Sequence, residues 1–308
     1  MKARNCFPVA LTSLLLGLGT FLTHGDTVTL FSAADTGLRQ QNANNNLGGI
    51  AYVPVGTSSL GAKNRGLFKF NITGNVPANA TITSATILLT SAQGNGSPTH
   101  NLHRVLENWG EGNKLGGPDG NGNLGAPAGI DEATWNDRLS GSTAWSNPGA
   151  AAGSDFVLPP SGSGAVGGSG PSSFGSVGMA NDVQLWLTNP STNFGWILII
   201  ADETVIASAR RISSREDPNT NKFPKLVINY TLPGQAQPTI SQLGLIGNQV
   251  RFSFDAEANQ TYIVEFRNSL SSGDWATLTN FGLNPSPGII SVTNTISSTE
   301  RYFRVRHP

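Results

Sequence analysis

The sequence predicts an all-β protein made of two antiparallel β-sandwiches, a larger one followed by a smaller one. Short segments alternate apolar and polar residues with the period of a strand, so that Phe68, Phe70 and Ile72 share one face while Lys69 and Asn71 share the other. The 308-residue chain contains 37 Gly and 18 Pro, which suit many turns between short strands. Only 12% of the residues are charged, too few for long amphipathic helices.

In the larger part, strands are expected wherever this alternation recurs. The segments are 27–31, 67–72, 83–89, 101–106, 195–200 and 225–230. One helix is expected over 181–188, where Val183, Trp186 and Leu187 share a face and Asp182 is placed to cap the first turn. Two segments rich in Gly, 112–130 and 146–178, are expected to be long surface loops. Strands that follow one another with so little helix between them favour a sandwich.

A second strand pattern begins after a short linker over 233–240, which separates an expected domain over 26–232 from another over 241–308. Its five expected strands are 249–254, 261–266, 275–279, 289–293 and 302–305. This length and strand number are typical of a small immunoglobulin- or fibronectin-like sandwich. It contains no catalytic constellation, and its role stays open.

Residues 1–25 have the three parts of a secretory signal peptide: Lys2 and Arg4, an apolar run over 7–22, and a small residue before an expected cleavage at Asp26. The alternative is an N-terminal membrane anchor, but the run is short and no basic flank follows it. We therefore expect a secreted, extracellular or cell-surface protein without a membrane span. Cys6 is the only cysteine, so the mature chain is expected to lack disulfides and thiolate chemistry.

The charge balance argues against nucleic acid as a partner. The chain has 19 basic and 19 acidic residues, and loss of the signal peptide would leave a small acidic excess. Duplex binding needs a strong basic excess instead. Basic residues nevertheless gather in two regions, 39–104 and 210–225, which could converge into one cationic face. Scattered, solvated charge is the alternative.

Nine short motifs of the larger part occur in an order that is fairly specific. They are Ala34-Asp35-Thr36 with Asn46-Leu47-Gly48-Gly49, Arg65 to Phe70, Ala80 to Ala85, Trp109-Gly110-Glu111-Gly112, Ala133 to Asn136, Asp182-Val183 with Trp186-Leu187, Asn193 to Trp196, Ser214-Arg215-Glu216, and Pro224-Lys225-Leu226. Over residues 27–231 the chain resembles the DNRLRE-domain family of secreted bacterial proteins. That family is related to carbohydrate-binding module family 96 and to repeats of archaeal disaggregatase. The resemblance implies a jelly-roll β-sandwich and binding of polysaccharides such as alginate. The loops at 112–130 and 146–178 look longer than is typical of the family, and no separate catalytic domain accompanies the module.

The candidate ligand-binding residues are Lys69, Arg104 and Arg211. Lys69 is expected to point away from the core, and the two arginines are expected to share its surface. Guanidinium groups bind carboxylates through paired hydrogen bonds, which suits an acidic polysaccharide.

Trp145 completes the candidate set, because it adjoins a turn-forming segment and is expected to be exposed as a stacking platform for sugar. Trp186 and Trp196 are expected in the core instead.

A structural calcium ion is the one cofactor that the sequence leaves open, with Asp119, Asp131 and Glu132 as candidate ligands. An EF-hand is excluded, because Leu124 stands at the glycine position and Ile130 at the position of the bidentate acid. Turn capping is the alternative role of these acids.

Catalytic motifs are weak. His100 and His103 are three residues apart on an expected strand, so they point to opposite faces and a polar strand-edge role is favoured over a metal site. No G-x-S-x-G elbow is present. Six acids lie within 107–137, but a glycosidase needs two of them at a defined separation, and Glu111 is equally suited to pair with Arg215.

The leading hypothesis is a secreted, non-catalytic protein that binds an acidic polysaccharide. The second is a structural or adhesive protein of the envelope or matrix. The third is a polysaccharide lyase or hydrolase built on the acidic cluster.

Overall fold

The computed structural model describes residues 24–94, 96–116, 124–232, 238, 240–258, 260–269, 274–295 and 300–306. These residues belong to two compact units, one ending at residue 233 and one beginning at residue 234. Strands dominate both units, which confirms the predicted all-β class. No helix in the described ranges is long and apolar enough to span a bilayer. Most of the expected signal peptide, including Cys6, and most of the expected linker lie outside these residues.

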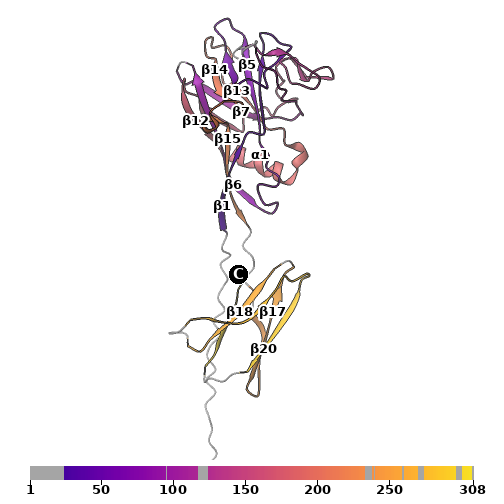
Figure 1. Cartoon of the computed structure of the whole chain (residues 1–308), viewed down its shortest axis with the longest axis vertical. Coiled ribbons are helices and arrows are strands. Elements are labelled where there is room, and N and C mark those ends of the chain that lie inside the picture. Colours follow the sequence, from indigo (N-terminus) through magenta and orange to yellow (C-terminus); the bar gives the residue numbers. More distant parts are fainter. Residues whose placement is uncertain are drawn as a thin grey trace, which may run out of the picture. The chain divides into compact units, whose positions relative to one another are not determined.

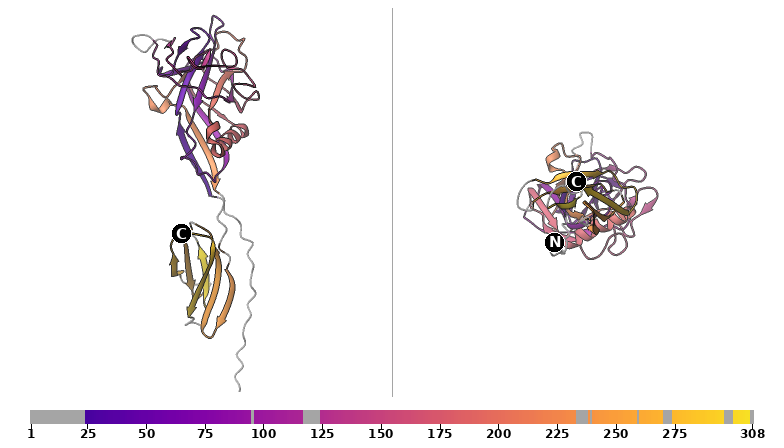
Figure 2. Two further views of the ribbon diagram at one scale, coloured as in Figure 1. Left: turned by 90° about the vertical axis from the view of Figure 1, so that its right-hand side faces the viewer. Right: turned by 90° about the horizontal axis from the view of Figure 1, so that it is seen from below.

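The larger unit is built from antiparallel strand pairs. Its main strands are β1 (His24–Phe31), β2 (Ala34–Arg39), β4 (Tyr52–Thr57), β5 (Lys63–Lys69), β6 (Thr81–Gln93), β7 (Thr99–Arg104), β11 (Gly162–Ala165), β12 (Gly170–Gly175), β13 (Trp196–Ile200), β14 (Arg210–Ser213) and β15 (Lys225–Leu232). Short pairs join β3 (Asn45–Asn46) to β8 (Ala126–Pro127) and β9 (Asp137–Leu139) to β10 (Thr143–Ala144). The first and last of these strands, β1 and β15, lie side by side (Figure 2).

The strands form two layers that β4 connects. One layer contains β1, β15, β6, β12 and β14, and the other contains β2, β5, β13, β7 and β11. Strand β4 pairs with β14 over Tyr52–Val55 and then with β5 at Gly56 and Thr57. Gly56 has a φ of +90°, a conformation that favours glycine, at the point where the strand passes from one layer to the other.

The core lies between the layers because side chains alternate along each strand. Phe68 on β5 and Phe70 just after it are buried in this core, whereas Leu67 belongs to a second cluster on the opposite face of the strand. Lys69 shares that opposite face with Leu67.

Helix α1 (Val177–Thr188) lies beside β6 and covers the core (Figure 1). The expected helix is confirmed but begins earlier, because Ser176, not Asp182, is the N-cap. Asp182 is inside the helix, where it accepts a hydrogen bond from the indole of Trp196 at 2.8 Å. Trp186 packs against Trp196 with ring centroids 4.5 Å apart, and both are fully buried as expected.

The smaller unit contains two three-stranded sheets. They are formed by β16 (Ile240–Ile246), β17 (Gln249–Ala256) and β20 (Gly288–Thr295), and by β18 (Tyr262–Arg267), β19 (Ala276–Phe281) and β21 (Tyr302–Arg306). Phe252, Phe254, Tyr262 and Val264 form its buried core. The unit is a small sandwich with its own core.

Candidate ligand-binding site

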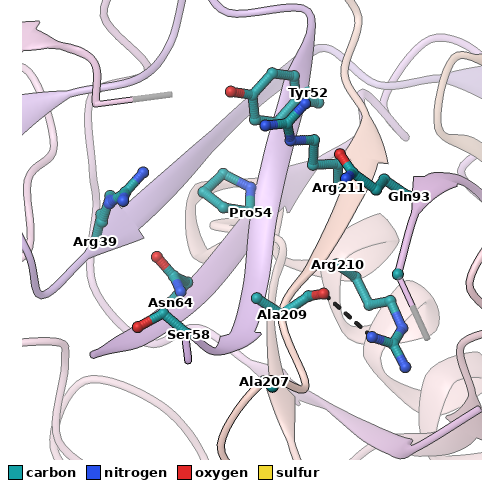
Figure 3. Close-up of a pocket in the computed structure, with 11 residues that line it drawn as sticks. Arg39, Tyr52, Pro54, Ser58, Asn64, Gln93, Ala207, Ala209, Arg210 and Arg211 are labelled. Atoms are coloured by element: carbon teal, nitrogen blue, oxygen red, sulfur yellow. Dashed lines mark hydrogen bonds between the residues drawn. The ribbon is translucent and has the colours of Figure 1, made fainter. Parts of the chain in front are cut away.

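A cavity of about 330 Å³ opens on the larger unit where β2, β4, β5, β6 and β14 meet (Figure 3). It is lined by Arg39, Tyr52, Pro54, Ser58, Asn64, Gln93, Gly94, Ala207, Ala209, Arg210 and Arg211. Among these described lining residues, every charged side chain is an arginine. The cavity is therefore suited to an anion.

Strand alternation places the key side chains on the outer face of the layer. Val53, Val55 and Ile212 are buried in the core, so their neighbours Tyr52 on β4 and Arg211 on β14 point the other way. In Figure 3 the side chains of Tyr52 and Arg211 lie together. The Arg211 guanidinium carbon is 4.7 Å from the centre of the Tyr52 ring, a cation–π contact.

Burial and mutual charge set the ionisation of this group. Burial raises the pKa of the Tyr52 hydroxyl, although the nearby charges of Arg211 and Arg39 oppose this shift. The hydroxyl therefore keeps its proton at neutral pH and remains a hydrogen-bond donor. Burial also lowers the pKa of Arg39, but a guanidinium stays charged under physiological conditions.

Arg210 points away from the Tyr52 side of the cavity and is only 1% exposed (Figure 3). It donates hydrogen bonds to the carbonyls of Ser208 and Ala209 at 3.0 and 3.1 Å. Gly94 lies directly on this side chain, since a Cβ there would be 2.2 Å from Cδ of Arg210. Arg210 thus forms part of the cavity wall, and its hydrogen bonds to backbone carbonyls fix the position of its charge.

The structure places one of the three predicted basic residues, Arg211, in the cavity and separates the other two from it. Lys69 points out of the opposite layer, on the face of β5 that carries Leu67. Arg104 shares the core-facing side of β7 with Leu102 and forms an ion pair with Asp182 at 2.9 Å. The expectation of one surface formed by Lys69, Arg104 and Arg211 is wrong, because their strands present them to different faces.

Trp145 is also not the expected exposed platform. It is 4% exposed, packs in the second cluster with Trp109 and Trp135, and donates its indole N–H to the carbonyl of Thr134 at 3.0 Å. The cluster covers the outer face of β5 and β13 through Leu67 and Ile197. Trp145 therefore has a packing role.

The candidate calcium ligands do not form a site among the described residues. Asp131 is exposed and accepts a hydrogen bond from the Ser142 hydroxyl at 3.1 Å. Glu132 accepts the backbone N–H of Gly129 at 2.7 Å and pairs with Lys114 at 3.4 Å. Glu132 therefore has the turn-capping role that was the alternative, whereas Asp131 bonds a side-chain hydroxyl. Asp119 lies outside the described residues.

A different carboxylate group forms around Arg215. Oxygen atoms of Asp35, Glu111 and Glu216 lie within 4.8 Å of one another, close enough for a metal ion. Arg215 supplies the positive charge here, with ion pairs of 3.0 Å to Glu111 and 3.2 Å to Glu216, and its backbone N–H donates to Asp35 at 3.1 Å. The expected pair of Glu111 and Arg215 is thus confirmed.

The crowding of these acids changes their ionisation. Burial, followed by repulsion from Glu216, raises the pKa of Asp35 well above its usual range. Burial, followed by repulsion from Glu111, raises the pKa of Glu216 to about 7. The pKa of Glu111 is also raised, mainly by burial. Part of the negative charge is therefore removed by protonation near neutral pH.

The two histidines of β7 lie in the interior, not at a polar strand edge. They face opposite sides as predicted: Nδ1 of His100 bonds the carbonyl of Pro98 at 3.1 Å, and Nδ1 of His103 bonds the carbonyl of Val157 at 3.0 Å. His100 is fully buried, and burial lowers its pKa to about 4. Both belong to the packing of the unit.

The acids within 107–137 that the structure describes are dispersed. Glu107 pairs with Arg138 at 3.4 Å, Glu132 pairs with Lys114, and Glu111 belongs to the Arg215 group. This arrangement gives no facing pair of the kind a glycosidase uses among those residues.

The ligand-binding candidates expected from the sequence do not include four residues that line the cavity, Tyr52, Arg39, Asn64 and Gln93. Arg39 belongs to one of the two basic regions of the sequence and Arg211 to the other, so the regions meet at this cavity. The alternation of Tyr52-Val53-Pro54-Val55 was the available signal for an outward tyrosine. A comparison with models of known protein families finds no match, and a search of curated proteins finds none either.

Proposed function

We propose that the chain is an exported, non-catalytic binding protein for an acidic polysaccharide, and that the cavity between Arg39, Tyr52 and Arg211 holds a uronate residue of that polymer. The observation that carries the proposal is the cavity lining, in which every described charged residue is an arginine. The planar fork of a guanidinium matches a carboxylate and binds it through two hydrogen bonds.

The remaining lining groups suit a sugar. Gln93 offers an amide, Ser58 offers a hydroxyl, and Tyr52 offers a ring held by Arg211. The amide nitrogen of Asn64 already donates to the carbonyls of Gly56 and Ala62. Few polar groups in a defined arrangement are typical of ligand pockets. The raised pKa of Tyr52 favours a hydrogen-bonding role over that of a general base. The resemblance of residues 27–231 to the DNRLRE-domain family supports the same class of ligand.

Affinity electrophoresis of the full chain through gels that contain alginate, pectin or a neutral glucan tests the proposal. We expect retardation in the acidic gels alone. The double variant Arg39→Ala/Arg211→Ala should bind about tenfold more weakly or worse, since two charge-assisted contacts are lost. Arg251→Ala, which removes an exposed arginine from the smaller unit, is the matched control. The proposal would be refuted if all three gels retarded the chain equally, or if the acidic gels retarded the double variant as much as the Arg251→Ala control.

A further inference from the structure

A second hollow, of about 600 Å³, lies in the larger unit beside Ala33, just before β2, whereas the first cavity lies beside Arg39 at the end of that strand. It is lined by Phe31, Ser32, Ala33, Asn71, Arg215, Thr220 and Phe223. Among these described lining residues, the only charged side chain is again an arginine. We infer that this hollow is a second sugar subsite, and that one uronate polymer occupies it together with the Arg39/Tyr52/Arg211 cavity. The inference rests on the proposed function.

An exposed aromatic pair forms one wall of the hollow. Phe31 is 53% exposed, and its ring meets that of Phe223 edge to face with centroids 6.2 Å apart. Nζ of Lys225 lies 5.6 Å from the centre of the Phe31 ring. An exposed phenylalanine at the end of a strand does not stabilise the core, because Leu30 before it already points inward. An aromatic face with an adjoining cation, here Lys225, is the combination that stacks on a pyranose ring while pairing with its carboxylate.

Arg215 is fixed in a way that leaves it partly in solvent. Its Nη1 donates to the carbonyl of Ala33 at 2.6 Å and pairs with Glu111, and its Nε pairs with Glu216. The side chain is nevertheless 39% exposed. Glu111 and Glu216 already take up the charge of Arg215, so this side chain gives the hollow a fixed polar edge. The cation that can pair with a uronate carboxylate here is Lys225, beside the Phe31 ring.

The two hollows lie within reach of one short polymer. Arg211 and Arg215 are four positions apart, so their Cα atoms are separated by at most about 14 Å. Strand β2 has one residue near each hollow. Arg39 lines the first, and Asp35, on the same face of β2, accepts the backbone N–H of Arg215, which lines the second. A few pyranose units span such a distance. A ligand that fills both hollows gains the second set of contacts without a second loss of translational freedom.

Titration calorimetry of the full chain with the disaccharide, tetrasaccharide and hexasaccharide of galacturonate tests the inference. We expect the affinity to rise at least tenfold from the disaccharide to the hexasaccharide. Phe31→Ala/Phe223→Ala should weaken hexasaccharide binding about fivefold and leave the disaccharide unchanged, because only the second hollow is altered. Phe31→Trp should keep the gain with length. Leu283→Ala removes an exposed apolar side chain from the smaller unit and is the control.

The outcomes separate the two claims. If the disaccharide binds and depends on Arg39 and Arg211, but affinity does not grow with length or the phenylalanine variant behaves as wild type, the second subsite is refuted and the proposed function stands. If no oligomer binds, both are refuted. Single Phe31→Ala, at a position more than half exposed, keeps the test valid if the double variant does not fold.

Discussion

The guanidinium of Arg215 forms an ion pair of 3.0 Å with the carboxylate of Glu111, although 104 positions separate the two residues in the chain. The same side chain reaches Glu216, and its backbone reaches Asp35. One cation thus pairs with two acids, and the backbone N–H of the same residue binds a third. The three acids come from β2, from the segment after β7 and from the turn after β14. This arrangement links distant parts of the larger unit.

We expect Arg215→Met to destabilise the larger unit by about 2 kcal/mol at pH 8, because partly buried carboxylates lose their counter-charge. The loss should shrink at pH 5, because Glu216, with a pKa of about 7, is then protonated and the raised pKa of Asp35 reduces its charge as the pH falls. Urea unfolding followed by tryptophan fluorescence at the two pH values measures this difference. An equal loss at both values would show that packing, not charge, is the contribution of Arg215.

Glu216→Gln should stabilise the unit at pH 8. The pKa of Glu216 rises from 4.5 to about 7 on folding, so the folded state binds more protons than the unfolded state between these values. Stability from this group is therefore fully present below pH 4.5 and is lost as the pH rises through 7. The loss is on the order of 2 kcal/mol for a side chain with some solvent contact. Thermal unfolding of wild type and variant from pH 4 to pH 8 should converge at the acidic end.

The effect of His100 on the pH dependence of stability has the opposite sign. Its pKa falls from 6.5 to about 4 on folding, so the unfolded state binds more protons between these values. Its contribution is present above pH 6.5 and is lost, by roughly 3 kcal/mol, as the pH falls through 4. His100→Leu should remove this acid sensitivity. The slope of stability against pH is the readout, and a slope equal to that of wild type would contradict a buried neutral histidine.

Trp145→Ala should destabilise the larger unit by about 3–5 kcal/mol, because it leaves a cavity in the cluster with Trp109 and Trp135 and an unpaired carbonyl at Thr134. Trp145→Phe should cost less, since most of the volume remains. Chemical denaturation gives both values. A large loss of polysaccharide binding by Trp145→Phe at unchanged stability would restore the interpretation of Trp145 as a platform.

The sequence predicts the long alternating strands well because a hydrophobic face is visible at period two, as on β5, β6 and β15. It gives no strand at β2, β4 or β14, and it misses β11 and β12, which lie inside the expected loop over 146–178. Their glycines and serines carry no hydrophobic pattern, and the small residues are required by close packing: a Cβ at Gly164 would lie 2.9 Å from the ring of Phe174. Strand content of this kind is set by tertiary contacts.

The candidate site, like the strands, is predicted only in part from the sequence. Alternation correctly places Lys69 away from the core between the layers, but it cannot say which layer each strand joins. Lys69 and Arg211 therefore emerge on different faces. The polar neighbours of Trp145 wrongly suggest an exposed side chain, because the loops fold back to cover the outer face of β5 and β13. Only the topology brings Arg39 and Tyr52 to Arg211.

Binding of an acidic polysaccharide should weaken steeply as the salt concentration rises. The contacts that we propose are between partly exposed arginines and carboxylates, and such interactions are screened over about 10 Å at 0.1 M ionic strength. Affinity for galacturonate oligomers, measured by calorimetry over a series of sodium chloride concentrations, should give a linear fall on logarithmic axes. Arg211→Ala should flatten this fall by removing one ionic contact, whereas Tyr52→Phe should lower the affinity and leave the slope unchanged, because it removes a hydroxyl and no charge. A slope that Arg211→Ala does not alter, or an affinity independent of salt, would show that binding does not depend on the charge of the cavity.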